Sequence, residues 1–333
     1  MNLEEFNRQF PDEETCRHFL EQVFWPQGRR CPHCGGNKSW PITGVSVRPG
    51  LYECAECGSQ FTVTTKTPLH STKLPTKTWL LALYCMANTS KGISSVYLAK
   101  WIGTTQKTAW RMGHILRTLM SVQIAAQDQL SGPVEVDETY VGGPPRSERG
   151  VKFKRGRGSR NPCVMVIVTR NAQARAEEID CASHKEMKPR LLRLVSPKAT
   201  LNTDELNVYT KLGQEFADHN VVAHNAGEYA RGEVHCNTAE SFNAILERAR
   251  FGVFHTMSRL HLSKYLSEVV FQWNHRQPAR VVIKKGREKT IWEPMPVLVK
   301  MASLLKHAVG VQLRRLANGG IRRLPLQQPS FGG

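Results

Sequence analysis

The sequence predicts an α/β protein whose core is preceded by a small cysteine-rich module and a short run of helices. Two CxxC pairs lie between residues 31 and 57. Residues 76–120 repeat their apolar side chains at helical spacing. Further along, the uninterrupted apolar run of residues 163–169 is typical of a strand buried on both faces, and more strands and helices follow it.

The composition favours a protein that binds a polyanion. The chain of 333 residues is long enough for two or three domains, and its formal net charge of +18 attracts nucleic acid. Charge alone fits equally well a basic protein that merely stays soluble, so motifs must decide. There is no apolar run of eighteen residues, and the start of the chain is polar and acidic. We therefore expect a soluble cytoplasmic protein that does not associate with membranes.

The first 27 residues are expected to form one leading helix. Phe19, Leu20, Val23 and Phe24 recur at helical spacing, and the acidic segment before them suits a helix N-terminus.

Residues 28–68 are predicted to form a zinc ribbon. Its ligands are the thiols of Cys31, Cys34, Cys54 and Cys57. Two knuckles of this spacing can place four thiolates tetrahedrally around Zn²⁺, and so short a module needs this link because it cannot bury a core of its own. Tyr52, Phe61 and Val63 indicate short strands. Four cysteine ligands close the site, so the zinc is structural, and His33 is not expected to be a ligand. The five scattered cysteines are expected to be reduced thiols.

Residues 74–128 are expected to form a DNA-binding domain of three helices. Its second half has a short helix, a turn with Thr104 or Thr105 as N-cap, and a longer helix that bears Lys107 and Arg111, as in a helix-turn-helix. We expect both side chains to contact DNA. The alternative is a three-helix unit that only packs.

A basic loop is expected at residues 144–160. Its seven lysines and arginines face a single acid, Glu148. Lys154, Arg155 and Arg157 are therefore candidates to bind phosphates, although such a charge run can also be a plain solvated surface.

Three carboxylates are candidates for a catalytic metal site. Asp137 follows Val134 and Val136 on a predicted strand, Asp204 lies where another strand ends, and Glu240 lies near the start of a helix. Phosphoryl transfer needs such acids, because carboxylates must hold two Mg²⁺ ions roughly 3.5–4 Å apart. The alternative is that these are ordinary surface acids.

Over residues 10–277 the chain resembles a known family. The motifs that carry the resemblance are CPHCG, YECAECGSQFTVTTKT, VEVDETYVGG, TDEL and HCNTAESFNAILERARFGVFHTMSRLHLSKYLSEVVFQWNHR, in that order. Together they resemble the zinc-ribbon transposases of bacterial insertion sequences, which have a ribonuclease H-like DDE domain. The resemblance implies that Asp137 and Asp204 are the first two acids and Glu240 the third, and that the four cysteines form the ribbon.

The third acid has two competing candidates. The family usually has a basic residue seven positions after this acid, but here that position is Glu247, followed by Arg248. Either Arg248 substitutes for that basic residue and contacts DNA, or the assignment shifts and Glu247 is itself a candidate for the third acid. Some relatives have an asparagine in place of the acid, which makes Asn237 a candidate, although we expect Asn237 to be the N-cap of its helix. We favour Glu240, with Glu247 facing the neighbouring arginines or solvent.

The predicted organisation has five segments. They are a leading helix (1–27), a zinc ribbon (28–68), a helical DNA-binding domain (74–128), a ribonuclease H-like DDE domain (130–283) and a basic C-terminal extension (284–333).

The predicted function is transposition of DNA by a bacterial, nucleoid-associated protein. The resemblance implies that the chain binds transposon ends in double-stranded DNA, cleaves them with Mg²⁺ and joins the 3′-hydroxyl to target DNA, as a homo-oligomer on the DNA. One alternative is a zinc-ribbon transcription regulator without catalysis. The other is a metal-dependent nuclease without strand transfer.

Overall fold

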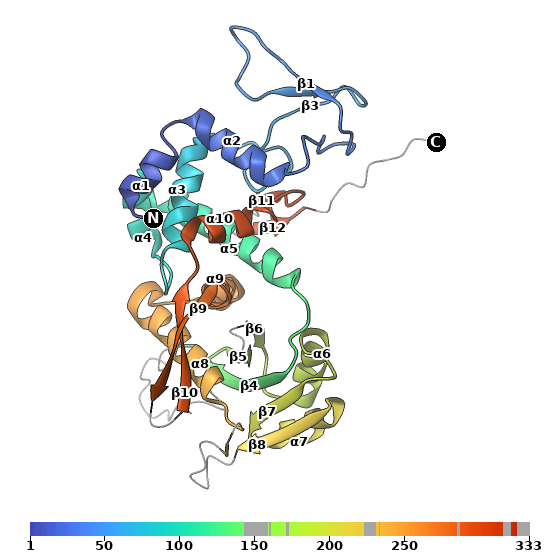
Figure 1. Ribbon diagram of the computed structural model, residues 1–333, viewed down its shortest axis with the longest axis vertical. Coiled ribbons are helices and arrows are strands. Elements are labelled where there is room, and N and C mark those ends of the chain that lie inside the picture. Colours follow the sequence, from blue (N-terminus) through green and yellow to red (C-terminus); the bar gives the residue numbers. More distant parts are fainter. Residues whose placement is uncertain are drawn as a thin grey trace, which may run out of the picture. The chain divides into compact units, whose positions relative to one another are not determined.

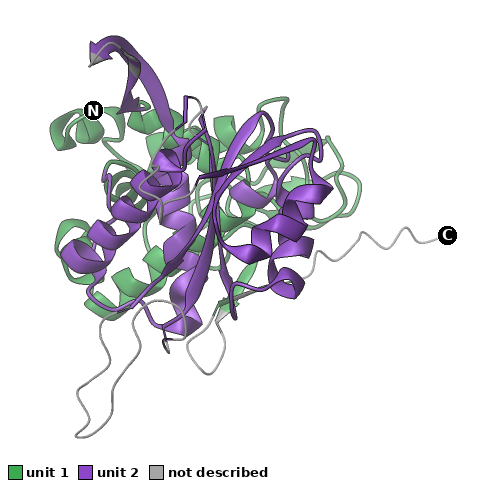
Figure 2. Ribbon diagram, turned by 90° about the horizontal axis from the view of Figure 1, so that it is seen from below, with its two compact units in different colours: residues 1–88, 95–123, 295–333 green, residues 89–94, 124–294 purple. Residues whose placement is uncertain are grey.

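The computed structural model describes residues 1–142, 159, 161–170, 173–222, 231–232, 234–284, 287–315 and 321–324. Figure 1 labels the helices and strands. The chain divides into two compact units, which are coloured separately in Figure 2. Unit 1 comprises residues 1–88, 95–123 and 295–333, and unit 2 comprises residues 89–94 and 124–294.

Unit 2 is built on a five-stranded mixed sheet. Its strands are β4 (Pro133–Tyr140), β5 (Cys163–Thr169), β6 (Ala174–Ile179), β7 (Thr200–Asp204) and β8 (Asp218–Val222). Their spatial order is β6-β5-β4-β7-β8. The first three strands pair antiparallel, whereas β7 pairs parallel with β4 and β8 parallel with β7. This is the ribonuclease H-like α/β arrangement, so the predicted fold class is confirmed.

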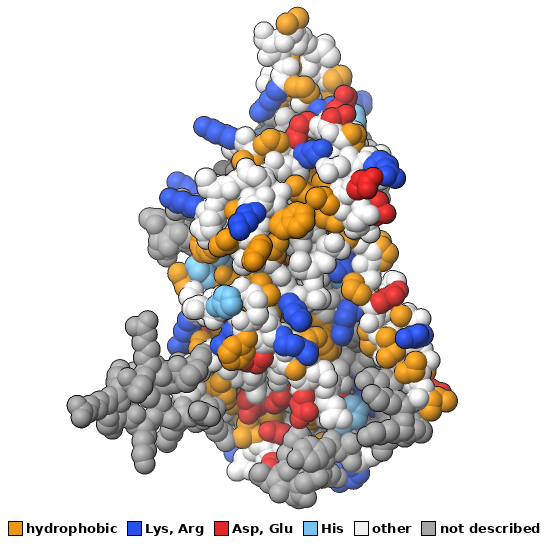
Figure 3. Space-filling view, turned by 90° about the vertical axis from the view of Figure 1, so that its left-hand side faces the viewer, with side chains coloured by type: hydrophobic (Ala, Val, Ile, Leu, Met, Phe, Trp, Pro, Cys, Tyr) orange, Lys and Arg blue, Asp and Glu red, His pale blue; other side chains and the backbone are white. Residues whose placement is uncertain are grey.

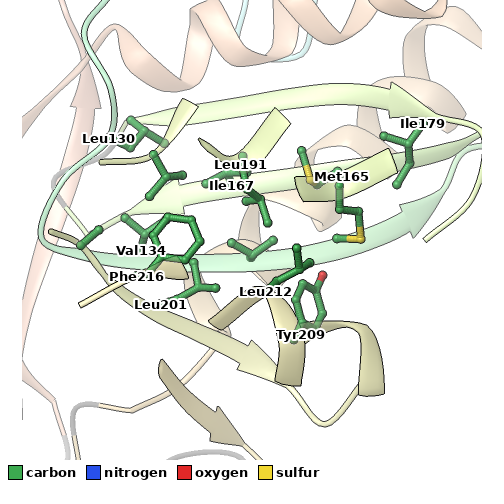
Figure 4. Close-up of a cluster of buried hydrophobic side chains, with 14 of the residues drawn as sticks. Leu130, Val134, Met165, Ile167, Ile179, Leu191, Leu201, Tyr209, Leu212 and Phe216 are labelled. Carbon is green, nitrogen blue, oxygen red and sulfur yellow. The ribbon is translucent and has the colours of Figure 1, made fainter. Parts of the chain in front are cut away.

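Helices cover both faces of this sheet. Helices α6 (His184–Leu194) and α7 (Asn207–Leu212) pack on one face, in the hydrophobic cluster drawn in Figure 4. Helices α8 (Asn237–Ala249) and α9 (Leu262–Asn274) pack on the other. All seven residues of β5 are buried, as its uninterrupted apolar run predicted.

The alternation of side chains along β4 decides which face of the sheet its acidic side chains occupy. Val134 and Val136 belong to the cluster on the α6 and α7 face. Because successive side chains of a strand point to opposite faces, Glu135 and Asp137 point to the α8 face.

Three elements of unit 2 differ from the expectation. Helix α6 was not predicted, because its polar sequence with Pro189 inside the helix resembles a loop. The sequence also predicts a helix over residues 206–217, but the structure has the shorter helix α7 followed by a 3₁₀ turn (Gly213–Glu215). An antiparallel hairpin of β9 (Arg276–Lys284) and β10 (Arg287–Pro294) follows α9 and spans the boundary proposed at residue 284.

Unit 1 begins with two helices; the second is the predicted leading helix, which opens at the acidic segment, and the first was not predicted. They are α1 (Leu3–Gln9) and α2 (Glu13–Phe24). Pro11 disfavours helical backbone at the residue before it, and the side chain of Asp12 starts a new helix by accepting the Thr15 N–H at 2.8 Å.

The ribbon follows these helices, with strands β1 (Ser39–Pro41), β2 (Tyr52–Cys54) and β3 (Gln60–Phe61) in one antiparallel sheet. Tyr52 and Phe61 lie in strands as predicted, whereas Val63 lies in the turn after β3.

The three expected helices of the next segment are present. They are α3 (Thr76–Ala87), α4 (Ser95–Ile102) and α5 (Gln106–Ala125). A short turn with Gly103 in the left-handed region (φ 65°) joins α4 to α5. The hydroxyl of Thr105 accepts the Thr108 N–H at 3.3 Å, so Thr105 is the N-cap of α5.

The C-terminal stretch adds a helix to unit 1. The sequence of residues 297–309 predicts a helix, and helix α10 (Val297–Leu305) is present there and contacts α2 and α3. The buried Nζ of Lys300 donates to the carbonyl of Ala87 at 2.9 Å, at the end of α3, and burial lowers the pKa of Lys300 to about 8. A short hairpin of β11 (Leu313–Arg315) and β12 (Ile321–Arg323) follows.

Candidate active site and zinc-binding site

Asp137 and Asp204 lie side by side on neighbouring strands. The parallel pairing of β4 with β7 runs up to Val136 opposite Thr203. Asp137 and Asp204 are the next residue of each strand, so they occupy the same level of the sheet, about 4.8 Å apart in the direction of the strand pairing. The sheet thus brings together two acids that are 67 positions apart in the sequence.

Glu240 approaches the same place from α8. It is an exposed residue in the first turn of that helix, and its charge and that of Asp204 both raise the pKa of Asp137. Burial is the largest cause of the shift, which brings the pKa of Asp137 from 3.8 to about 6. Asp137 therefore experiences the charges of both Asp204 and Glu240.

The spacing of the acids is wider than that of a closed single-ion cage. In the described part of the chain, only the four ribbon cysteines form a group of at least three metal-ligand residues with all ligand atoms within 4.8 Å of one another. Two ions roughly 3.5–4 Å apart do not require such a tight cluster of carboxylates. On the face shown in Figure 3, acidic side chains gather in one patch in the lower part of the view.

Asn243 is a residue of this site that the sequence did not reveal. It lies one turn after Glu240, and its Nδ2 donates to Oδ2 of Asp137 at 2.8 Å. The other amide atom, Oδ1, is buried and has no hydrogen-bond partner among the described residues. The position three residues after Glu240 was the available signal, since residues i and i+3 share a helix face. This free acceptor and the three carboxylates fit the oxygen ligands that Mg²⁺ prefers.

Glu135 also belongs to this region and was not singled out from the sequence. It is fully buried, and its carboxylate accepts from the N–H of Thr238 at 2.7 Å and of Ala239 at 3.0 Å. An acid between two valines on a buried strand was the signal, because buried carboxylates need partners.

Among the described residues, neither competing candidate for the third ligand, Asn237 or Glu247, forms a hydrogen bond or ion pair with Asp137. Asn237 is the first residue of α8 and is exposed; the N-cap is Cys236, so the prediction that Asn237 caps the helix was wrong. Glu135 serves as the acceptor that a capping side chain would otherwise provide. Glu247 forms an ion pair with Arg250 at 2.9 Å, in line with the expectation that it faces the neighbouring arginines. Arg248 is exposed.

The four ribbon cysteines form a site with the dimensions of tetrahedral zinc. The sulfurs of Cys31 and Cys57 are 3.7 Å apart, and those of Cys34 and Cys54 are 3.5 Å apart. A tetrahedron with Zn–S bonds of 2.3 Å has S···S edges of about 3.8 Å. The backbone N–H groups of His33 and Gly36 donate to the sulfurs of Cys31 and Cys34, both at 3.4 Å. Hydrogen bonds from Ser59 lower the pKa of the Cys57 thiol to about 6, which favours its thiolate, whereas burial raises the pKa of the Cys31 thiol.

Of the predicted DNA-contacting residues, the structure describes Lys107, Arg111 and Arg248. Lys107 and Arg111 are both exposed on α5 and line a cleft of about 600 Å³ within unit 1. The loop of residues 68–74 and the β11–β12 hairpin also contribute to this cleft. Arg248 lies on α8, and Lys154, Arg155 and Arg157 lie outside the described residues.

A stability measurement tests the charge balance at Asp137. The pKa of the Asp137 carboxyl is higher in the folded protein than in the unfolded chain, so the folded protein binds the carboxyl proton more tightly. The folded state therefore loses stability as the pH rises from about 4 through 6 and this proton dissociates. We expect Asp137→Asn to stabilise the protein without added divalent cation by up to about 3 kcal/mol at pH 8 and by about half of that at pH 5. Thermal unfolding of the full chain measures this. If the Asp137→Asn protein is no more stable than the parent at pH 8, the negative charge of Asp137 does not destabilise the metal-free protein, and this prediction is refuted.

Comparisons with known proteins agree with this geometry. A family model described as an ISXO2-like transposase domain matches residues 129–274, and one described as a transposase zinc-ribbon domain matches residues 11–60. A protein described as an uncharacterized protein in transposable element ISH50 of Halobacterium salinarum is 28% identical over 299 residues, which are 85% of this chain and 97% of that protein.

Among solved structures, a chain of a pre-cleavage Mos1 transpososome is 10% identical, with a TM-score of 0.22, over 57% of this chain and 75% of that chain. None of the described helices is both long and apolar enough to cross a membrane. The two family models cover the cysteine cluster and the sheet with its three acids, and the chain belongs to the insertion-sequence transposases with a zinc ribbon and a ribonuclease H-like DDE domain.

Proposed function

We propose that the protein is a Mg²⁺-dependent DNA transposase whose metal ligands are Asp137, Asp204 and Glu240. The observation that carries the proposal is the meeting of three acids from β4, β7 and α8, where the charges of Asp204 and Glu240 raise the pKa of Asp137. Bound Mg²⁺ would relieve this repulsion and, during phosphoryl transfer, would neutralise charge on the attacking and leaving oxygens.

The reaction proposed is two successive in-line displacements at phosphorus. In the first, a water oxygen bonds to the phosphorus at the transposon end, and the bond from that phosphorus to the 3′-oxygen breaks, which frees a 3′-hydroxyl. In the second, this 3′-oxygen bonds to a phosphorus of the target, and the 3′-oxygen of the target leaves. The protein holds the ions and the DNA in line and forms no covalent bond to either strand.

The DNA partners are proposed to bind largely outside the acidic site. Carboxylates repel phosphates when no metal is bound, so affinity must come from basic residues elsewhere. We propose that Lys107 and Arg111 on α5 bind the transposon end together with the ribbon, which belongs to the same unit. Lys154, Arg155, Arg157 and Arg248 are proposed to bind further phosphates. Because two ends must be processed together, the active form is proposed to be a homo-oligomer on DNA.

A cleavage and joining assay tests this function. The full-length protein is incubated with Mg²⁺, labelled DNA that contains the transposon end, and an unlabelled target plasmid. We expect cleavage at the end and label joined to the plasmid. Cleavage without joining would reduce the function to a nuclease. Binding without cleavage, over a range of Mg²⁺ and Mn²⁺ concentrations, would favour the transcription regulator.

A further inference from the structure

Buried carboxylates are expensive unless they are paired, and Glu135 is fully buried in the sheet of unit 2. Its partners come mostly from the start of α8. Oε2 accepts the backbone N–H groups of Thr238 and Ala239 at 2.7 and 3.0 Å, and Oε1 accepts the hydroxyl of Thr238 at 2.8 Å. On the other side, Nδ1 of His235 lies 3.1 Å and Nε of Arg170 lies 3.7 Å from Oε1.

These contacts replace an ordinary helix cap. The N-cap residue of α8, Cys236, makes no capping bond with its side chain. The first N–H groups of a helix have no partner within the helix, and the positive end of its dipole favours a negative charge. Glu135 satisfies both needs from a strand about one hundred residues earlier in the sequence.

A second hydrogen-bonded contact between α8 and β4 lies one turn further along the helix. Asn243 donates to Asp137 at 2.8 Å, and Asp137 is two residues after Glu135 on the same face of β4. Glu240 lies between these two contacts, directly after Ala239 and three residues before Asn243. Two fixed points on one helix restrict both its sliding along the sheet and its rotation about its own axis. Together they determine where Glu240 stands relative to Asp137.

We propose that Glu135 is a positioning residue, which fixes the start of α8 on β4 and so holds Glu240 at the distance from Asp137 that the metal site requires. This inference rests on the proposed function of Glu240. Metal sites lose affinity when their ligands are held loosely, because the ions tolerate only small errors in ligand position. Glu135 itself touches neither metal nor DNA in this account.

The test compares Glu135→Gln with a matched destabilised control. Glutamine keeps the size of the side chain but loses the charge and one acceptor, so the N–H groups at the start of α8 are held less well. Leu191→Ala is the control, because Leu191 is buried on the opposite face of the same sheet and should cost a similar amount of stability. Thr238→Val, which removes only the hydroxyl bond, is a milder second variant in case Glu135→Gln fails to fold.

Two measurements are made on the full-length proteins. The first is hydrogen exchange of the peptide that covers the first turns of α8, without divalent cation, which needs no activity. The second is the Mg²⁺ concentration that gives half-maximal cleavage of end DNA. We expect Glu135→Gln to speed exchange at the start of α8 and to raise the half-maximal Mg²⁺ concentration about tenfold. Thr238→Val should do both to a lesser degree, and Leu191→Ala should leave the Mg²⁺ requirement unchanged.

Three outcomes would overturn the proposal. If exchange at the start of α8 is unchanged, Glu135 does not anchor the helix. If exchange rises but the Mg²⁺ requirement stays at the parent value, the anchor exists and does not serve the metal site. If Leu191→Ala raises the requirement as much as Glu135→Gln, the effect is general destabilisation. A parent protein that never cleaves would instead refute the proposed function, while the exchange result would still decide whether the anchor exists.

Discussion

Replacing Asp137 or Asp204 by asparagine is expected to lower the rate of DNA cleavage at least about a thousandfold, because several kcal/mol of charge stabilisation disappear with the metal and each 1.36 kcal/mol is a factor of ten. The amide keeps the shape of the side chain but not its charge. Glu240→Gln is expected to have a comparable effect. Binding to end DNA should stay close to normal in all three variants, because it is proposed to depend on residues such as Lys107 and Arg111.

The matched control for these variants is Glu247→Gln. Glu247 lies on the same helix as Glu240, two turns later, and is paired with Arg250 instead of the acids. We expect it to keep most of the activity. Initial rates of cleavage, measured at several Mg²⁺ concentrations with equal amounts of bound DNA, give the comparison. An active Glu240→Gln protein beside an inactive Glu247→Gln protein would show that the third ligand is Glu247.

Loss of one ribbon cysteine is expected to unfold the ribbon. Only four residues of this module form its buried cluster, and two of them are the ligands Cys31 and Cys54. Zinc contributes about 10–16 kcal/mol of apparent binding free energy in small zinc modules, so the fold cannot survive without it. We expect Cys54→Ser to retain no bound zinc, to expose residues 28–68 to protease and to weaken binding to end DNA.

Cys181→Ser is the control for this prediction, because Cys181 is an exposed thiol outside the ribbon. Zinc content of the purified full-length proteins, measured by mass spectrometry, should be one ion per chain for the parent and for Cys181→Ser. One zinc per chain in Cys54→Ser would contradict the ligand assignment.

The parts of the fold that could be predicted are those whose physical cause lies in neighbouring residues of the sequence. The apolar run of β5 has no polar face, so it had to be buried on both sides. The spacing of the ribbon cysteines limits how the thiols can meet, and the four sulfurs do meet. Thr105 could be named as a possible N-cap because a capping side chain lies next to its own helix. In each case the interacting residues are near in sequence or share one strand.

The features that the sequence did not predict correctly depend on contacts between residues that are far apart in the sequence. Asn237 was expected to cap α8, but the cap comes from Glu135, 103 residues before Thr238. Local preference could not reveal this, because a buried acceptor from the sheet overrides the choice of capping residue. Helix α6 is held by two buried side chains, Met187 and Leu191, although Pro189 argues against a helix locally. Tertiary packing decided both.

The candidate site was predictable only in part. The resemblance to known transposases drew attention to Asp137, Asp204 and Glu240, and the register of β4 and β7 explains why the first two are neighbours. Asn243 and Glu135 were missed because their roles depend on how α8 lies against β4, which neither spacing nor composition specifies.

The most direct test of the central claim is to locate the divalent ions. Crystals of the full-length protein bound to end DNA, grown with Mn²⁺ in place of Mg²⁺, would show the ions by anomalous scattering. We predict one or two Mn²⁺ peaks within ligand distance of the carboxylates of Asp137, Asp204 and Glu240, and none in crystals of the Asp137→Asn protein. Mn²⁺ held by Glu247, or no Mn²⁺ near Asp137 and Asp204 in a complex that cleaves its DNA, would contradict the account.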